Sequence, residues 1–203
     1  MTKKVSGGRP TDERASAALK TAALHLVREN GYEKVSIAAI AKEAGVARQT
    51  LYNRWNTKAD LVLEAVFEQT GNYAAQPALE EDKRCRVALE EFLINVFEHL
   101  NKDRDTLCSI IAAAQKDVTF NASFYTHFVL PREKMITALL HRAQERGELL
   151  PDRNPEMIST MIHGAFWYRL LNRGALDARL AKDITTEIFE RPPTSPECVA
   201  VGS

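Results

Sequence analysis

Residues 36–58 read SIAAIAKEAGVARQTLYNRWNTK, and the organisation of the whole chain follows from this stretch. Ile37, Ile40 and Ala41 recur at helical spacing. Gly45 then interrupts the pattern with a residue that can adopt the positive φ of a tight turn, and a second short helical pattern follows. Two helices joined by a short turn that contains glycine form the geometry that places the second helix in the major groove of DNA. The stretch therefore predicts a helix-turn-helix.

The second helix of this pair has one apolar and one polar side. Leu51 and Trp55 lie four residues apart on one face, so we expect both to pack in the core. The other side carries residue types that suit contacts in a DNA groove: Arg48, Gln49, Tyr52 and Asn53. Each of these alone would also fit an ordinary solvated surface. Together with the turn they indicate DNA binding.

The ends of these helices differ in how well they are capped. Ser36 is a good N-cap, although Ala39 leaves the capping box half complete, and a hydroxyl at a helix N-terminus also suits a phosphate. Ala47 has no side-chain oxygen, which costs about 1 kcal/mol relative to Ser at an N-cap. We therefore expect the second helix to fray in the absence of DNA. Thr57 caps a further helix, and Lys58 in its first turn opposes the helix dipole, which a phosphate partner would explain.

The residues before this stretch predict a long amphipathic helix behind a short arm. The helix ends near Asn30, and Gly31 is its natural stop. The arm, residues 1–9, is polar and basic, and it suits either a contact with DNA or a solvated tail. Residues 1–60 hold eleven Lys or Arg against six Asp or Glu, whereas the remainder holds sixteen against twenty-one. The zero total thus hides a basic end suited to a polyanion, although an excess this small also arises by chance.

Length and composition fit an intracellular helical protein. The 203 residues allow one large helical domain or two smaller ones. Cys85, Cys108 and Cys198 are widely spaced and form no C-x-x-C pair, which fits a reducing cytoplasm. No apolar run approaches the roughly 20 residues that cross a bilayer, and no signal peptide is evident. We expect a cytoplasmic protein with no membrane partner.

Several spacings in the helix-turn-helix stretch are those of a known family. They are A-x-x-A-G-V at 41–46, T-L-Y at 50–52, an aromatic residue three positions after the tyrosine, and a lysine three positions beyond that. With these motifs, residues 9–65 resemble the TetR/AcrR family of bacterial transcriptional regulators. The resemblance implies that Gly45 is the turn glycine. It also implies phosphate contacts from Ser36, Thr50, Tyr52 and Lys58.

Two positions depart from the family's common pattern. Ala47 replaces the usual capping serine, and Ala38 stands where some members carry a base-reading arginine. We therefore expect the first helix of the pair to contribute little direct readout. The resemblance then leaves sequence discrimination to the groove face of the second helix: Arg48, Gln49, Tyr52 and Asn53.

Beyond residue 70 the chain predicts more helices and no convincing strand, so we predict an all-α fold of about nine helices. An apolar stripe ends near Asn101, and Pro131 marks a kink or a boundary within a helical segment at 121–146. Five segments are expected: a flexible basic arm at 1–9, a helix-turn-helix DNA-binding domain at 10–56, a connecting helix at 57–72, a helical ligand-binding and dimerisation domain at 79–191, and a tail at 192–203.

The resemblance also implies a small, often apolar effector bound inside the C-terminal helical domain. Aromatic residues concentrate between positions 92 and 168, where they either line such a pocket or simply fill a helical core. The candidate pocket residues are Phe92, Phe97, Phe124, His127, Phe128, Met161, His163 and Trp167.

We expect a homodimer, because one short recognition helix contacts few bases and two copies related by a two-fold axis read two half-sites. In the resembled family the last two helices form a four-helix interface. Here the last two predicted helices are apolar on more of their circumference than a lone surface helix would be. The candidate interface residues are Met157, Ile158, Ile162, Phe166, Leu170, Leu180, Ile184 and Ile188.

The sequence carries no familiar enzyme motif: G-x-x-x-x-G-K, G-x-S-x-G and H-E-x-x-H are all absent. His141 and Glu145 lie four apart, but one such pair without a third ligand is weak evidence for a metal. We expect no catalytic residue, cofactor or metal site, and we predict a ligand-responsive repressor that binds a palindromic operator as a homodimer. Two other classes stay open: a small-molecule-binding helical protein or enzyme without specific DNA binding, and a nonspecific architectural DNA binder.

Overall fold

The computed structural model describes residues 10–71 and 82–190, and all regular structure in these two ranges is helical. The expected arm at 1–9 and tail at 192–203 lie outside the described residues. The elements are α1 (Pro10–Asn30), α2 (Ile37–Glu43), α3 (Arg48–Tyr52), α4 (Lys58–Gly71), α5 (Cys85–Lys102), α6 (Arg104–Ala114), α7 (Val118–Phe124), the π-helical segment η1 (Tyr125–Val129), α8 (Leu130–Glu145), α9 (Pro155–Leu171) and α10 (Ala178–Phe189). Because α7, η1 and α8 are continuous, the prediction of an all-α fold of about nine helices is confirmed.

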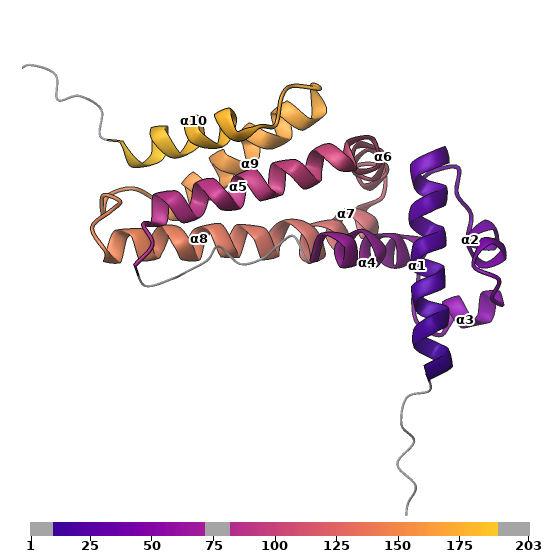
Figure 1. Cartoon of the computed structure of the whole chain (residues 1–203). Coiled ribbons are helices and arrows are strands. Elements are labelled where there is room, and N and C mark those ends of the chain that lie inside the picture. Colours follow the sequence, from indigo (N-terminus) through magenta and orange to yellow (C-terminus); the bar gives the residue numbers. More distant parts are fainter. Residues whose placement is uncertain (1–9, 72–81, 191–203) are drawn as a thin grey trace, which may run out of the picture.

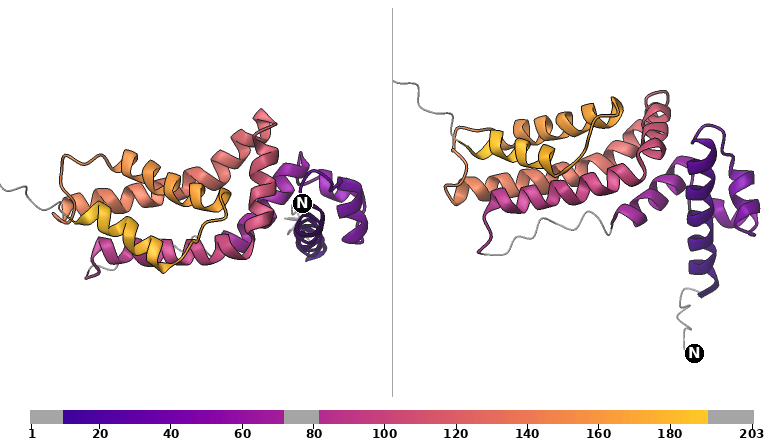
Figure 2. Two further views of the ribbon diagram at one scale, coloured as in Figure 1. Left: turned by 90° about the horizontal axis from the view of Figure 1, so that it is seen from above. Right: turned by 45° about the horizontal axis from the view of Figure 1, so that its top comes forward.

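The helices form a small N-terminal unit and a larger bundle (Figure 1). In the small unit α1 runs across the direction of the long bundle helices, and α2 and α3 lie on the side of α1 that faces away from the bundle (Figures 1 and 2). Helix α4 joins the two units, since it packs against α1 and also contacts α7 and η1. Any movement of α4 relative to the bundle therefore reaches the small unit.

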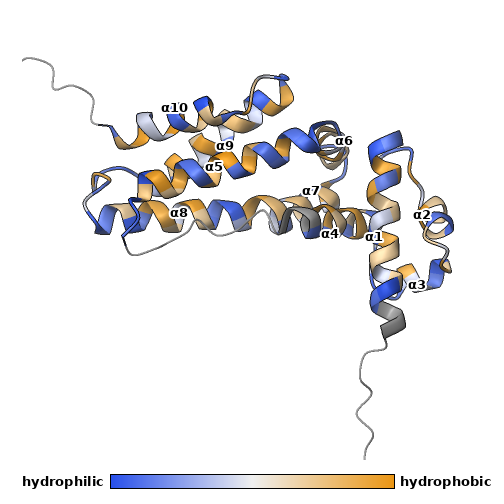
Figure 3. Cartoon of the chain, viewed as in Figure 1, coloured by the Kyte–Doolittle hydropathy of each residue, from blue (hydrophilic) through white to orange (hydrophobic). Residues whose placement is uncertain are grey.

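The bundle is built from amphipathic helices that pack in pairs. Helix α10 packs on α5, α8 packs on α9, and α5 also contacts α8. Hydrophobic and hydrophilic residues alternate along α1, α5 and α8 (Figure 3), as expected of helices with one buried face. One continuous core runs through both units, from Leu19 and Leu51 through Val62 of α4 to Leu93 and Leu139. Within the described ranges no helix is both long and apolar enough to span a membrane.

Pro131 shapes the segment between α7 and α8. Proline has no N–H, and its ring clashes with the carbonyl four residues earlier, here that of His127. The helix widens at this point into η1, where the Leu130 N–H bonds to the Tyr125 carbonyl, five residues back. The sequence predicted a kink or a boundary at Pro131, and the change from η1 to α8 falls at Leu130, directly before it, while the chain stays helical. Such turns are rare and are frequently found at functional sites.

Candidate nucleic-acid interface and interior cavity

The turn between α2 and α3 closes with local hydrogen bonds. The Ser36 side chain caps α2 by accepting from the Ala39 N–H at 3.1 Å. At the other end, Gly45 has a φ of +66° and its N–H bonds to the Lys42 carbonyl, while the next N–H, of Val46, bonds to the carbonyl of Ala41. This pair of bonds is a Schellman motif, which needs the left-handed conformation that glycine adopts freely. The turn therefore depends on the positive φ of Gly45, as the sequence indicated.

Helix α3 presents its polar side to solvent. Leu51 and Trp55 are buried, which confirms their assignment to the core. Gln49 donates from Nε2 to Oδ1 of Asn53 at 3.1 Å, so these two side chains are already oriented together one turn apart. The structure also shows no side-chain cap at Ala47. The exposed side of the recognition helix and its C-cap consists of Arg48, Gln49, Tyr52 and Asn53.

A carboxylate on α4 holds the chain that leaves α3. Trp55 donates from Nε1 to Glu64 Oε2 at 2.7 Å, and Oε1 of the same side chain lies 3.5 Å from Arg54 and 3.4 Å from Lys20 of α1. Arg54 also donates to Ser16 Oγ on α1 at 2.8 Å. Glu64 thus ties α1, α4 and the residues directly after α3 to one another.

Lys58 has partners within the protein. Its ammonium donates to the carbonyls of Tyr32 at 2.8 Å and Val35 at 2.9 Å, and it lies 4.0 Å from the centroid of the Tyr32 ring. Burial lowers the pKa of Lys58. An ammonium has three donors, so one N–H is left for a phosphate. In the structure Lys58 thus fixes the loop before α2.

The small unit is docked on the bundle by the end of α1. Arg28 donates from Nε and Nη2 to the two carboxylate oxygens of Asp103, at 2.8 and 3.0 Å, at the junction of α5 and α6. The Tyr32 N–H donates to Ser109 Oγ of α6 at 2.9 Å. The Tyr32 ring lies 4.8 Å from that of Phe120 in α7. The orientation of the recognition helix is thus coupled to α6 and α7.

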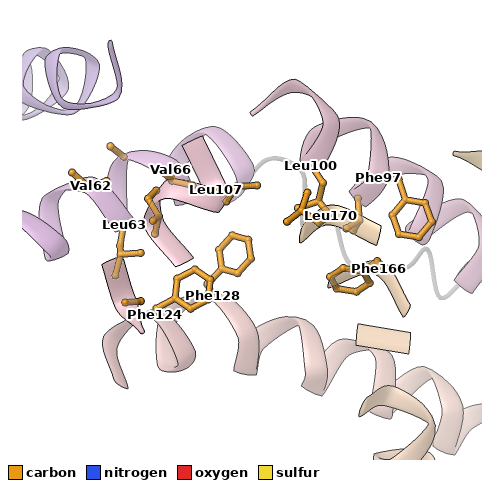
Figure 4. Packing of buried hydrophobic residues seen from close by; sticks show 14 of the residues in the cluster. Val62, Leu63, Val66, Phe97, Leu100, Leu107, Phe124, Phe128, Phe166 and Leu170 are labelled. Atoms are coloured by element: carbon orange, nitrogen blue, oxygen red, sulfur yellow. The ribbon is translucent and has the colours of Figure 1, made fainter. Parts of the chain in front are cut away.

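The bundle contains a small, partly open cavity of about 30 Å³, enough for about two water molecules. Helix α4 forms one side of it, where Val66 lies over Phe128 (Figure 4). The lining residues are Val66, Val96, His99, Leu100, Asp103, Leu107, Phe128, Arg132 and Phe166. The cavity is thus a small, mostly apolar space with a few polar groups in its wall.

Most of the expected pocket residues lie elsewhere. Of that set only Phe128 is in this cavity's lining, while the other buried phenylalanines fill the core: Phe92, Phe97 and Phe124. Met161 is 64% exposed and His127 is exposed, so placing these two in an interior pocket was wrong. His127 instead borders an open cleft of about 370 Å³ between α4 and α7. The spacing of apolar residues distinguishes the buried face of a helix from its exposed face only when the exposed face is polar. Both faces of α9 carry apolar residues, so the spacing did not indicate that Met161 is exposed.

Two polar groups lie in this region of the bundle. Arg132 donates from Nη1 to the Phe128 carbonyl at 2.7 Å, and its guanidinium lies 3.9 Å from the centroid of the Phe128 ring; burial lowers its pKa to about 10. His163 is buried beside Phe166, and its Nδ1 donates to the Ser159 carbonyl at 2.8 Å. Its Nε2 is buried and has no hydrogen-bond partner. Burial lowers the pKa of His163, so the ring is neutral at pH 7 and Nε2 is an acceptor.

The expected dimer residues divide into three sets: four that are buried on α9, three that are half-buried on α10, and Met157, which is exposed. Ile158, Ile162, Phe166 and Leu170 are all buried within the protomer, so assigning them to a dimer interface was wrong. On α10, the expected residues Leu180, Ile184 and Ile188 are half-buried and pack against the core, as does Phe189. The opposite side of α9 exposes large apolar side chains instead: Met157, Met161, Tyr168 and Leu171. Their exposed fractions lie between 53% and 68%.

Two family models match the chain. The model of bacterial regulatory proteins of the tetR family matches residues 19–65. The model of the tetracyclin repressor-like C-terminal domain matches residues 80–188, more than half of the chain. The chain belongs to the TetR family. The family inferred from the motif at 41–58 is thereby confirmed, and with it the function of a helix-turn-helix transcriptional regulator.

Relatives of this TetR-family chain agree with the assignment. An HTH-type transcriptional regulator of Bacillus subtilis, YdeS, is 27% identical over 90% of this chain and 92% of its own length. The DNA-binding transcriptional repressor TetR of Mycobacteroides abscessus is 26% identical over 85% and 92%. The structure of FadR from Bacillus subtilis in complex with stearoyl-CoA superposes with a TM-score of 0.69, at 18% identity over 85% of this chain and 97% of that one. The last comparison shows a shared fold.

The sequence did not indicate two of the contacts that position the site in this TetR-family protein. Glu64 and the Arg28–Asp103 pair join residues that are far apart in the chain, and no local pattern marks them.

His141 pairs with Glu156 of α9 at 3.1 Å. Among the described residues no group of three or more His, Cys, Asp or Glu is arranged to hold a metal ion.

Proposed function

We propose that this protein is a repressor that binds a palindromic operator as a homodimer and is released by a small-molecule effector. The observation that carries the proposal is the exposed polar side of α3, held in place by buried Leu51 and Trp55. Four side chains that suit groove contacts share this side, on a helix-turn-helix of the TetR family. In the cell the protein would act in the cytoplasm, where its DNA is.

The proposed contacts divide by chemistry. Arg48, Gln49 and Asn53 carry side chains whose donors and acceptors match base edges in the major groove. The remaining contacts would be made to phosphates by Ser36, Thr50, Tyr52 and Lys58. The Ser36 oxygen accepts from the Ala39 N–H, which leaves its hydroxyl proton for a phosphate oxygen.

We propose that the dimer forms through the exposed side of α9. Its residues 157, 161, 164, 168 and 171 follow a spacing of four, three, four and three, the period of helices that pack along a seam. The middle position is Gly164, where an added Cβ would meet no atom of another part of the protomer within 4 Å, so a partner helix can approach closely. Large apolar side chains flank it on both sides. The half-buried side chains of α10 would border this seam.

The effector is proposed to act by linkage. Proteins of related fold have been solved in complex with acyl-CoA molecules, as FadR of Bacillus subtilis with stearoyl-CoA. In this protein α4 lines the interior cavity through Val66 and holds the chain after α3 through Glu64. A ligand that enlarges the cavity would move α4 and change the spacing of the two recognition helices. Couplings of this kind amount to about 1–3 kcal/mol, and DNA weakens effector binding by the same factor.

A pair of variants tests the DNA-binding role of α3. We expect Arg48→Ala and Gln49→Ala each to weaken binding to a duplex selected by the unmodified protein by about tenfold or more, since a bidentate base contact contributes about 1–3 kcal/mol. Lys182→Ala, an exposed change on α10, serves as the control. Fluorescence anisotropy at one stated salt concentration measures the three affinities. Equal affinity in all three would exclude α3 as the reading helix.

A further inference from the structure

His163 is a polar residue on the buried side of α9, and only 8% of it is exposed. Its Nδ1 donates to the Ser159 carbonyl at 2.8 Å, which fixes the orientation and the tautomer of the ring. The lone pair is then on Nε2, which is buried and accepts no hydrogen bond from the described part of the chain. The fold thus holds a buried acceptor that the protein itself does not use. The other buried residues of this helix are mostly apolar: Ile158, Ile162, Phe166 and Leu170.

An acceptor in this state is costly to keep. Folding removes the water that Nε2 of His163 would bind in the unfolded chain, and without a donor in return the full cost of desolvation remains. A leucine at this position would fill the core without that cost. Natural structures leave few buried polar groups unpaired, and each exception needs a reason such as a functional role or an ordered water molecule. Nε2 of His163 is therefore a candidate acceptor for a bound molecule.

The His163 ring lies next to the wall of the bundle cavity. Its centroid is 5.1 Å from that of Phe166, and Phe166 lines the cavity (Figure 4). This one ring therefore borders both the cavity and His163. The cavity, at about 30 Å³, has room for about two water molecules, so an effector has to displace wall side chains to enter. An effector that displaces Phe166 would reach His163.

The chemistry of His163 restricts what it can bind. Burial lowers the pKa of His163; the Ser159 carbonyl and Glu133 oppose this shift, and Arg132 adds to it. The ring is therefore neutral at pH 7, so Nε2 accepts a hydrogen bond and the ligand has to bring the donor. A neutral hydroxyl or N–H group suits this place, because an ammonium group would be costly to bury. Six of the nine residues that line the cavity are aliphatic or aromatic, which favours a ligand with an apolar body.

We propose that the effector of this protein is a neutral, mainly apolar molecule with a hydroxyl or N–H group, and that this group donates a hydrogen bond to Nε2 of His163. This inference rests on the proposed function, because it names the ligand class of the same effector site. The apolar body occupies the cavity, enlarged by the displacement of Phe166. The hydrogen bond forms only in the form with bound effector, so it stabilises that form alone. Val66 of α4 belongs to the same cavity wall, which links the bound effector to the helix that holds the chain after α3.

Matched probes with and without a donor test the proposal on the full chain. Octanol and heptyl methyl ether are isomers, and only octanol has a hydroxyl group. Indole and benzofuran have nearly the same shape, and only indole has an N–H group. Octanoate tests whether a negative charge is preferred to the hydroxyl. Calorimetry gives the affinities, and NMR spectroscopy with isotope-labelled histidine follows the ring nitrogens directly. The chain has five histidines, and the signals of His163 are those that His163→Leu removes.

The expected result is that octanol or indole binds about fivefold or more tightly than its partner without a donor, as one neutral hydrogen bond provides. Only the probe with a donor should shift the Nε2 resonance of His163. His163→Leu should abolish the preference while retaining the binding of the ether or of benzofuran. His25→Gln, a change at an exposed position of α1, should leave the preference intact.

Three results overturn the proposal. The first is equal or tighter binding of both probes that lack a donor, and the second is tighter binding of octanoate than of octanol. The third is an Nε2 resonance of His163 that neither octanol nor indole changes up to its solubility limit. If that resonance also shows a hydrogen bond in the free protein, an ordered water molecule accounts for the buried nitrogen.

Two features of the design separate this inference from the proposed function. The preference for a donor is measured on the unmodified chain, so a folding defect of His163→Leu does not leave the proposal untested. DNA binding is measured separately on selected duplexes. A protein that selects a palindromic duplex but shows no preference for a donor retains the proposed function and refutes the inference. A protein that prefers the donor but selects no duplex retains the ligand site and refutes the proposed function.

Discussion

Gly45 and Gly147 share a backbone conformation and differ in where they lie. Their φ angles are +66° and +69°, and an added Cβ at either position would meet no neighbouring atom within 4 Å. The need for glycine at both positions is therefore conformational and not steric. Gly45 sets the angle between α2 and α3, whereas Gly147 ends the segment after α8, far from the recognition helix.

We predict that Gly45→Ala and Gly147→Ala each lower the free energy of unfolding by about 1–2 kcal/mol, the cost of a left-handed conformation at a residue with a Cβ. Only Gly45→Ala should also weaken operator binding, because it alone strains the turn that positions α3. Urea unfolding and anisotropy titration measure the two effects. A loss of operator affinity in Gly147→Ala equal to that in Gly45→Ala would contradict this reading of the turn.

His163 predicts a pH dependence of stability. Burial lowers its pKa in the folded protein below the usual value of 6.5, so on acidification the unfolded chain takes up the proton first. The stabilisation that depends on neutral His163 is therefore fully present at neutral pH and is lost as the pH falls below about 6.5. Over this range the free energy of unfolding declines by at most about 1.4 kcal/mol per pH unit. His163→Leu should remove this component. The prediction fails if the variant and the unmodified chain lose equal stability between about pH 7.5 and about pH 5.5.

At the scale of single elements, α3 is too short to hold its own place. It has five residues and no side-chain cap at its start, and isolated helices of this length are unstable in water. Its position depends on the burial of Leu51 and Trp55 and on the contacts of Glu64 with Trp55 and Arg54. We therefore expect α3 to follow α4 when α4 moves.

Two acidic residues of α4 allow this dependence to be tested. Glu64 contacts Lys20 and also the residues after α3, whereas Glu68, one turn later, pairs with Lys20 at 2.5 Å. We predict that Glu64→Ala weakens operator binding by about tenfold, because the buried indole N–H loses its acceptor and α3 loses its orientation. Glu68→Ala should leave operator binding within about twofold of the unmodified protein. Equal losses in both would show that Glu64 acts only through general stability.

The helix-turn-helix was predictable from sequence because its determinants are local. Each determinant depends on residues only a few positions away: the turn at Gly45, the cap at Ser36, and the buried pair Leu51 and Trp55. The interior of the bundle was not predictable in the same way. The cavity brings together residues from six elements, and the π-helical turn at η1 leaves no mark in the apolar periodicity.

Helix α9 shows why the dimer face was misassigned. It carries one apolar row spaced by four residues, from Ile158 to Leu170, and a second row with the four-three spacing from Met157 to Leu171. Both rows suit burial, so periodicity alone did not decide which one faces the core. The structure decides it, because the first row packs inside the protomer and the second lies at the surface.

At the scale of the whole molecule, the small unit and the bundle share one core and are joined through α4 and the end of α1. The position of the recognition helix is thus determined by contacts that also border the cavity, such as Arg28 with Asp103. The proposed repressor would require a second copy of the chain, because two half-sites would be read at a spacing that the proposed dimer fixes.

A dimer that forms through the exposed side of α9 and a dimer that forms through its buried row predict different effects of two substitutions. Tyr168→Glu places a charge in the exposed seam and should give a folded monomer in sizing chromatography. Phe166→Glu, by contrast, buries a charge in the protomer core and should unfold the chain, as seen in its circular dichroism. A Tyr168→Glu protein that elutes as a dimer would refute the proposed seam.

The most direct test of the central claim, that this protein reads a palindromic operator through α3 as a dimer, is selection of bound duplexes from a random pool at one stated salt concentration. The salt must be fixed because phosphate contacts make the affinity strongly dependent on it. We predict a consensus of two inverted half-sites whose centres lie about one helical turn or more apart. Recovery of duplexes without a shared sequence, or of a single half-site without its inverted copy, would contradict the account.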